Sequence, residues 1–371
     1  MKIALFTTSF PANAQNTLNA GVFVRDFAEA LTDLGHRVWV LTPRKKDSRH
    51  EFRHERTIFF RWLGDEDSLT HIDMKNPVGA LRLASVVAMG RVAAARLIRE
   101  FEPDHVLCFW VFPSGFWALR SKTKYSVWAL GSDVWTLGKM PGMRRVLRAI
   151  ARGATHSYAD GTDLAKELSA ITGTPSEFLA TSRILTQPEG VPVGQGGYFL
   201  YVGRYHPNKG IDLLVQAVAR ARPHLPGDFR LRVHGFGPLE AEVREAVQRQ
   251  GLRDIVDVHG PTRADEIGTV IRRARGLIVP SRIESLPVVL CDALQMDVPI
   301  LVTDVGDMGT LVRAHDAGVV CQPNVSSLAA SLVEFARAPG GSSAGREELR
   351  QLLDIRGSAR RFLADIGAEV R

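Results

Sequence analysis

The sequence predicts an α/β protein made of two doubly wound parallel-sheet domains, both Rossmann-like. Short buried-strand runs alternate with helix-period segments, this alternation occurs in both halves, and a dense Pro/Gly segment lies between the halves. The length of 371 residues agrees, since about 150 residues make one domain. We therefore expect a cleft between two domains.

The first half carries six strand-like runs. We expect strands at 2–6, 37–41, 57–62, 105–109, 125–129 and 156–159, with helices at 22–35, 78–101, 143–152 and 162–171. The second half repeats the pattern. We expect strands at 198–202, 230–234, 255–259, 276–279, 300–303 and 318–321, with helices at 210–221, 238–250, 263–273, 288–295 and 326–338.

Domain boundaries follow from composition. The Pro/Gly-rich segment 186–197 is the predicted linker between an N-terminal domain, 1–185, and a C-terminal domain, 198–344. The remaining polar helical segment, 345–371, is expected to pack back on the first domain.

The net charge of +7 does not by itself select a partner. We expect no nucleic-acid binding, because no recognised module or concentrated basic stripe is present. The segment 139–152 interleaves four arginines with apolar residues, so it is a candidate for contact with an anionic membrane. A core-packed helix with a solvated basic face is the favoured alternative, because any surface helix of a basic protein has this pattern.

Three features lead us to expect an intracellular protein. The first residues enter a strand-like run without a signal-peptide pattern, and Cys108, Cys291 and Cys321 suit buried free thiols in a reducing compartment. Arginines interrupt the apolar window 83–101, so we expect no membrane-spanning helix.

Two cations surround a strand-to-helix turn in the second half. Strand 198–202 is followed by Arg204 and Lys209, and a helix begins at about residue 210. The carboxyl ends of parallel strands are where open α/β sheets bind ligands, and a helix N-terminus favours anions. Arg204 and Lys209 therefore predict a diphosphate-binding site.

A second anion site is expected where strand 276–279 ends. If Pro287 lies in the first helical turn, the amides of Val288 and Val289 have no helical partner and can bind phosphate. Asp292 follows one turn later, where its carboxylate could bind vicinal hydroxyls, and Glu284 precedes the helix on the same loop.

The first strand-to-helix loop, 7–21, lacks the G-x-G-x-x-G pattern of dinucleotide-binding enzymes, which disfavours a dehydrogenase. It ends at Gly21 directly before a helix, so a backbone amide could approach a phosphate there. A surface loop with a terminal glycine is the alternative reading.

Together these motifs resemble the retaining glycosyltransferases of the GT-B fold, family 4 (glycosyl transferases group 1), over nearly the whole chain. The similar residues are Gly203-Arg204 with Lys209-Gly210, His234-Gly-x-Gly-Pro, Ser281-x-x-Glu284-Ser-Leu-Pro-Val-Val-Leu-x-Asp292, Gly21-Val-Phe-Val-Arg and Leu130-Gly-Ser-Asp133.

The resemblance implies roles for single residues. Arg204 and Lys209 would bind the donor diphosphate, Glu284 would contact the donor sugar, and Gly21 would approach the diphosphate from the other domain. Phosphate would be held by the backbone from Leu286 through Pro287 to Val288. Asp292 would hold the ribose.

Two positions depart from the family pattern. Asp292 stands where the family usually has Glu, and Leu130 stands where it usually has a His close to the reacting sugar. Asp133 is the nearest remaining polar candidate for a catalytic or acceptor-positioning role. Its alternative role is that of a structural turn or cap residue.

The implied activity is retaining transfer of a hexose from a nucleotide diphosphate sugar to a saccharide or lipid-linked acceptor, as in cell envelope polysaccharide synthesis. No metal and no cofactor is expected, because two cations and a helix N-terminus can stabilise the leaving nucleoside diphosphate. The protein would be cytoplasmic, and it could associate with the inner face of the membrane. A nucleotide-sugar epimerase or a non-catalytic binding protein of the same fold are the alternatives.

Overall fold

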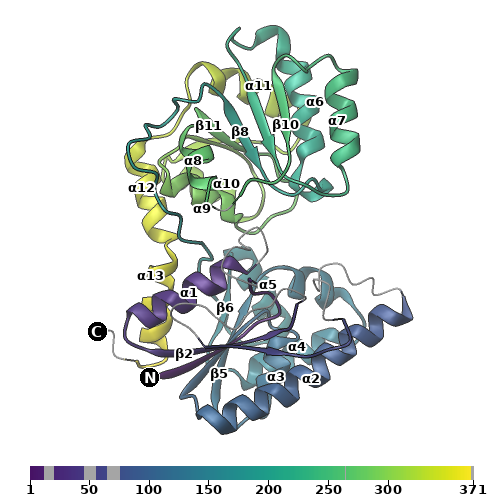
Figure 1. The fold of residues 1–371 in the computed structure, drawn as a ribbon, viewed down its shortest axis with the longest axis vertical. Helices are drawn as coiled ribbons and strands as arrows, with labels where there is room; N and C mark the ends of the chain where they lie inside the picture. The colour runs from purple at the N-terminus through teal and green to yellow at the C-terminus, as the bar shows by residue number, and fades with distance from the viewer. Residues whose placement is uncertain (12–20, 46–55, 65–75, 264, 369–371) are drawn as a thin grey trace. The chain divides into compact units, whose positions relative to one another are not determined.

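The computed structural model describes residues 1–11, 21–45, 56–64, 76–263 and 265–368. The chain forms two compact units. Unit 1 comprises Met1–Thr181 with Ile355–Arg371, and unit 2 comprises Ser182–Asp354. Each unit contains one parallel β-sheet between layers of helices (Figure 1).

Unit 1 contains seven parallel strands in the order β3-β2-β1-β4-β5-β6-β7. Both faces of the sheet are covered, so the strands are nearly continuous apolar runs instead of alternating ones. The strands are β1 (Lys2–Phe6), β2 (Arg37–Pro43), β3 (Arg56–Phe60), β4 (His105–Phe109), β5 (Lys124–Ala129), β6 (Ser157–Ala159) and β7 (Glu177–Phe178).

The helices of unit 1 form two layers. In one layer α2, α3, α4 and α5 contact one another in sequence, and in the other α1 packs against α13. Right-handed crossovers in opposite directions from β1 account for the two layers. The helices are α1 (Val22–Asp33), α2 (Pro77–Phe101), α3 (Ser114–Ala118), α4 (Met143–Gly153), α5 (Thr162–Thr172) and α13 (Ile355–Asp365).

The helix α13 brings the end of the described chain back to unit 1, beside α1 (Figure 1). Its Phe362 is fully buried, and the ring centroid lies 5.8 Å from that of Phe27 and 5.7 Å from that of His105. Ser358 donates a hydrogen bond of 2.8 Å to the carbonyl of Ala180. An aromatic cluster therefore holds this helix on the sheet.

Unit 2 contains six parallel strands in the order β10-β9-β8-β11-β12-β13. The strands are β8 (Phe199–Val202), β9 (Leu231–His234), β10 (Val256–His259), β11 (Gly276–Val279), β12 (Ile300–Thr303) and β13 (Gly318–Cys321). The helices are α6 (Ile211–Ala221), α7 (Glu240–Arg249), α8 (Ile267–Arg272), α9 (Val288–Gln295), α10 (Gly306–Ala314), α11 (Val325–Arg337) and α12 (Ser343–Leu352).

The segment predicted as a linker is attached to unit 2. Residues 186–197 contain no helix or strand, yet the amide of Gly194 donates to the carbonyl of Arg272, and Arg272 Nε donates to the carbonyl of Val191. Proline and glycine produce the turns of this segment, and its hydrogen bonds fix it in place.

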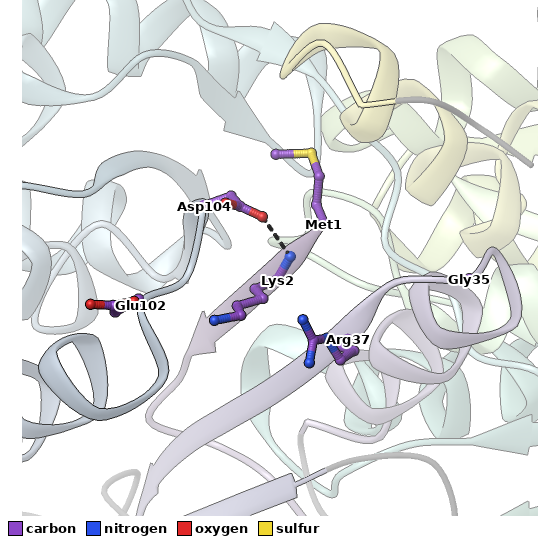
Figure 2. A pocket seen from close by; sticks show the side chains of 6 residues that line it. All are labelled: Met1, Lys2, Gly35, Arg37, Glu102 and Asp104. Carbon is purple, nitrogen blue, oxygen red and sulfur yellow. Dashed lines mark hydrogen bonds between the residues drawn. The ribbon is translucent and has the colours of Figure 1, made fainter.

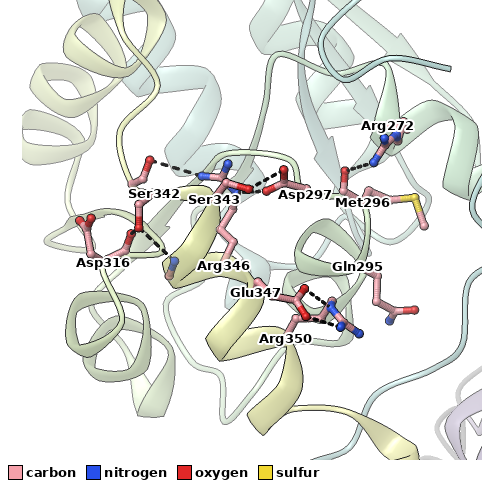
Figure 3. A network of polar contacts seen from close by, with 12 residues as sticks. Arg272, Gln295, Met296, Asp297, Asp316, Ser342, Ser343, Arg346, Glu347 and Arg350 are labelled. Atoms are coloured by element: carbon pink, nitrogen blue, oxygen red, sulfur yellow. Dashed lines mark hydrogen bonds and ion pairs between the residues drawn. The ribbon is translucent and has the colours of Figure 1, made fainter.

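The segment predicted as one returning helix consists of two helices with different neighbours. Helix α12 stays on unit 2, where the guanidinium of Arg346 donates to Asp297 at 2.7 Å and Ser343 donates to the same carboxylate at 2.8 Å (Figure 3). Only α13 belongs to unit 1. Residues 369–371 at the end of the predicted helix lie outside the described residues.

The predicted fold class is confirmed, and most predicted elements agree with observed ones to within a few residues. Two helices were not predicted. Helix α3 is only five residues long, and α10 begins Gly306-Asp-Met-Gly309, a composition with low helix propensity. The cysteines are all free and buried, as expected.

Truncation of Phe362 tests the attachment of α13. Phe362→Ala should lower the free energy of unfolding by about 3 to 5 kcal/mol, because it opens a cavity among buried aromatic rings. Chemical denaturation measures this change. The control Leu352→Ala, at an exposed position of α12, should change stability by less than about 0.5 kcal/mol. Equal effects of both substitutions would contradict the packing described.

Candidate functional site

The predicted site residues of unit 2 lie at the carboxyl edge of its sheet. The chain continues from β8 outward to β9 and β10, while β11, on the other side of β8, leads to β12 and β13. The loops after β8 and β11 therefore diverge at a topological switch point, where open α/β sheets form ligand sites. Arg204 and Lys209 follow β8, and Glu284 follows β11.

Arg204 presents an exposed guanidinium two residues after β8. Its backbone is held in place, because the carbonyl of Arg204 accepts hydrogen bonds from the Tyr201 hydroxyl and the His206 amide. Within the described residues its side chain has no hydrogen-bond or ion-pair partner. Partial burial and the charges of Arg204 and Lys209 lower the pKa of His206, as expected for a locally positive potential.

Lys209 and Glu284 form an ion pair that joins the two loops. The amide of Arg282 also donates to the carbonyl of Asn208 at 2.8 Å. Close approach of the loops requires glycine at position 210, where φ is 67° and a Cβ atom would lie 1.9 Å from the carbonyl oxygen of Pro280. The structure thus brings together two side chains that are 75 positions apart in sequence.

A second ion pair strengthens the same junction. The guanidinium of Arg282 donates two hydrogen bonds of 2.7 Å to the carboxylate of Asp212, in the first turn of α6. Burial opposes the charge of Asp212, but the hydrogen bonds and charge of Arg282 outweigh it and lower the pKa of the carboxyl group. The pair fixes the loop after β11 on α6, and sequence reasoning did not identify it.

The N-terminus of α9 lies at the end of the loop after β11. Pro287 is the N-cap residue with φ of −74° and ψ of 131°, so it immediately precedes the helix, one position earlier than predicted. Within the described chain the amides of Val288 and Val289 have no hydrogen-bond acceptor. Leu286 is buried, so only its backbone can contact a ligand. These amides form a potential anion site.

Two buried polar atoms near this edge also lack partners within the described residues, namely Ser285 Oγ and His234 Nε2. Ser285 lies between Glu284 and the helix N-terminus. His234 ends β9, its other ring nitrogen is 2.8 Å from the Thr262 hydroxyl, and burial with the charges of His259 and Arg232 lowers its pKa to about 4. Buried polar atoms are normally satisfied, so both are candidates for ligand contacts. No sequence pattern identifies Ser285 as a site residue, because its role depends on the burial of its hydroxyl in the folded chain.

Asp292 has a protein partner that was not predicted. Its carboxylate is fully buried and accepts hydrogen bonds of 2.8 Å and 2.5 Å from the guanidinium of Arg183. Arg183 lies near the start of unit 2, in residues 182–188, which form neither helix nor strand, and Gln295 Nε2 donates to its carbonyl. The predicted contact of Asp292 with a ribose stays untested, and this geometry favours a structural role.

Gly21 begins α1 at the carboxyl edge of the unit 1 sheet. Its φ is 107°, and a Cβ atom there would lie 2.3 Å from the carbonyl oxygen of Ser9. Glycine is therefore required by the approach of the chain to its own first loop. Most of that loop, 12–20, lies outside the described residues, and the predicted phosphate contact of Gly21 stays a prediction.

Asp133 lies in a π-helical turn, η2 (Ser132–Thr136), also at the carboxyl edge of this sheet. The carboxylate is 1% exposed, and its oxygens accept hydrogen bonds from the amides of Val111 and Leu130 at 2.7 Å and 3.2 Å. Burial raises its pKa to about 6, although four backbone hydrogen bonds act against the shift. These contacts favour the capping alternative over direct catalysis.

A hollow of about 530 Å³ lies at the opposite, amino edge of the unit 1 sheet (Figure 2). Two cations, Lys2 and Arg37, face two anions, Glu102 and Asp104, and the amide of Lys2 donates to Asp104 at 2.7 Å. The charges compensate one another. Ligand sites in such folds lie at the carboxyl edge, so this hollow is not the candidate site.

Known families match each unit of this chain. The glycosyl transferase 4-like domain matches residues 20–180, and the glycosyl transferases group 1 family matches residues 196–337. The chain consists of two glycosyltransferase domains. Colanic acid biosynthesis glycosyltransferase WcaL of Salmonella typhimurium is a relative of this glycosyltransferase, 24% identical over 381 residues and 91% of each chain. The Escherichia coli WcaL is 23% identical, also over 91% of each.

Solved structures confirm the GT-B architecture of this glycosyltransferase. Sucrose-phosphate synthase of Thermosynechococcus elongatus has a TM-score of 0.76 at 19% identity over 97% of both chains. Anabaena HepE in complex with UDP and glucose has a TM-score of 0.70 at 16% identity over 99% of both chains. The residues of the carboxyl edge of unit 2 thus belong to a glycosyltransferase group 1 domain.

The raised pKa of Asp133 makes part of the stability pH-dependent. The folded state binds the proton more tightly than the unfolded state, so this contribution is present below about pH 4 and is lost as pH rises through about 6. Relative to Asp133→Asn, the wild type should lose about 2 to 3 kcal/mol of unfolding free energy between pH 4 and 7. Denaturation curves at several pH values measure it, and parallel profiles would contradict it.

The pair Arg183–Asp292 should be strongly coupled in folding. Arg183→Ala should cost about 3 to 5 kcal/mol, because it leaves a buried carboxylate without its partner. The cost of Arg183→Ala combined with Asp292→Asn should fall well below the sum of the single costs. Arg249→Ala, which removes an exposed ion pair, is the control and should cost at most about 1 kcal/mol. Additive single costs would exclude a structural pair.

Proposed function

We propose that this glycosyltransferase moves a hexose from a nucleotide diphosphate sugar to a saccharide or lipid-linked acceptor, with retention of anomeric configuration, as a member of family 4. The observation that carries the proposal is the convergence of Arg204, the Lys209–Glu284 pair and the α9 N-terminus at one switch point. In this reaction the bond from the anomeric carbon to the diphosphate oxygen breaks, the nucleoside diphosphate leaves, the oxygen of an acceptor hydroxyl bonds to the anomeric carbon, and the hydroxyl proton passes to the leaving diphosphate.

The charges of the site suit a leaving diphosphate. Arg204 offers a planar guanidinium that can bind two phosphate oxygens, and the amides of Val288 and Val289 with the Ser285 hydroxyl offer neutral donors. Each such contact can contribute roughly 2 to 4 kcal/mol to transition-state stabilisation. Protein cations can thus stabilise the leaving group, so the proposal assigns no step to a metal ion.

Lys209 and Glu284 have linked roles in the proposed reaction. Their ion pair holds both side chains at the junction of the loops, so a phosphate near Lys209 places a sugar near Glu284. Glu284 would then contact sugar hydroxyls. Asp133 would shape the acceptor side of unit 1 by fixing the backbone at Val111 and Leu130, as a positioning residue.

Relatives suggest the kinds of substrate to test. HepE is described in complex with UDP-glucose, and WcaL is named as a colanic acid biosynthesis glycosyltransferase. We infer a cell envelope polysaccharide or its lipid-linked precursor as acceptor. Three buried free cysteines fit the reducing environment of the cytoplasm, which we propose as the location.

Substitution of Arg204 tests the diphosphate site. UDP, GDP and ADP are first compared by thermal shift, because a ligand of the folded state raises the melting temperature. For the best nucleotide, Arg204→Ala should weaken binding roughly 30-fold or more by calorimetry, since it removes a charge-assisted contact. Arg204→Lys should retain part of the affinity.

The matched control is Arg253→Ala, which removes an exposed arginine elsewhere in unit 2 and should leave nucleotide affinity unchanged. Unchanged affinity in Arg204→Ala would refute the proposed site. Product analysis with sugar donors of the best nucleotide separates the remaining activities. Sugar transfer with a retained anomer supports the proposal, and an epimerised donor in acceptor-free buffer refutes it. Nucleotide binding without turnover of any of these donors indicates a non-catalytic protein.

A further inference from the structure

The outer face of α2 is apolar for most of its length. Every exposed residue of this helix between Pro77 and Ala95 is apolar. Three of the large side chains on it, Val78, Leu81 and Val92, are 56%, 59% and 65% exposed. Soluble proteins rarely leave so long a helix face without polar cover, and such patches mark interaction sites. We call this face the α2 stripe.

The opposite side of α2 is attached to unit 1. Val86, Gly90, Ala94 and Leu97 are buried, at the spacing of one helix face. Arg91 bends inward, where its guanidinium donates to the carbonyls of Phe116 and Leu119 at 2.9 Å and 3.2 Å. The helix orientation is therefore fixed, and the α2 stripe faces away from the sheet.

By length and composition α2 could cross a membrane, and among the described residues no other helix could. Its burial argues against crossing, because spanning would remove Val86 and Leu97 from the core of unit 1. Only 22% of its most apolar window is buried, however, and the rest of that window is exposed or half-buried. A helix of this kind suits the interface of a bilayer.

Basic side chains accompany the α2 stripe. Arg96 and Arg99 are exposed in the last turns of α2, where Glu100 lies 3.7 Å from Arg96, so most of the excess positive charge comes from the neighbouring helix α4. Helix α4 covers the same face of the sheet, with α3 between the two helices, and it contains no acidic residue. Its exposed arginines are Arg144, Arg145, Arg148 and Arg152.

We propose that unit 1 docks on the surface of an anionic lipid bilayer through the α2 stripe, with arginines of α2 and α4 at the headgroups. Sequence reasoning considered only the segment around α4 as a lipid contact, and the structure adds the apolar half of the surface on α2. A second copy of the chain is a poorer occupant, because pairing two such faces would bring arginines of like charge together. The proposal does not depend on the proposed sugar transfer.

Vesicle flotation with the full chain tests the docking surface. The wild type should bind vesicles of phosphatidylcholine with phosphatidylglycerol, bind vesicles of phosphatidylcholine alone weakly, and lose affinity as salt is raised. Leu81→Gln with Val92→Gln should reduce binding to the anionic vesicles by about tenfold or more, because both exposed side chains would enter the bilayer interface. Arg144→Gln with Arg145→Gln should reduce the salt dependence.

A matched control removes one leucine and one valine from exposed positions of unit 2, Leu352→Gln with Val193→Gln, and should bind as the wild type does. Failure of the wild type to bind anionic vesicles would overturn the proposal, as would equal binding by the Leu81/Val92 double variant and the Leu352/Val193 control. A dimer in light scattering that only the α2 double variant dissolves would assign the stripe to a second copy instead. All three double variants should retain the nucleotide affinity of the wild type, which shows that unit 2 is intact whatever the vesicle result.

Discussion

The divergence of chain connections at β8 and β11 determines where unit 2 can place its charged residues. Parallel strands direct their carboxyl ends to one edge, and loops leaving two neighbouring strands in opposite directions leave space between them. The loops of Arg204 and Glu284 occupy that position, joined by an ion pair and by backbone contact at Gly210. The α9 N-terminus depends on this arrangement, because the same loop delivers it to the edge.

The two ion pairs that involve predicted site residues differ in environment. Lys209 and Glu284 retain 30% and 15% exposure, so a ligand can reach them and compete for either partner. Asp292 is 1% exposed, and exchanging the bidentate contact of Arg183, which is 17% exposed, for a ligand hydroxyl would leave a buried carboxylate without its charged partner. The first pair therefore remains accessible to a ligand, and the second attaches residues 182–188 to α9.

Unit 1 contains two features that lower its stability. Burial of the Asp133 carboxylate costs desolvation energy, and α2 exposes large apolar side chains to solvent. Both features oppose maximum stability of the isolated protein. Such exceptions to consistent local preferences are expected at sites of function.

The sequence by itself determined the two parallel-sheet domains, most element positions and the cluster of Arg204, Lys209 and Glu284, because periodicity and strand-to-helix placement are local properties. Only the tertiary structure decided which groups are paired or buried. It attached Arg183 to Asp292, left Ser285 Oγ without a partner among the residues that the structure describes, and divided the C-terminal segment between the units. Those outcomes depend on contacts between residues far apart in the chain, which no local pattern records.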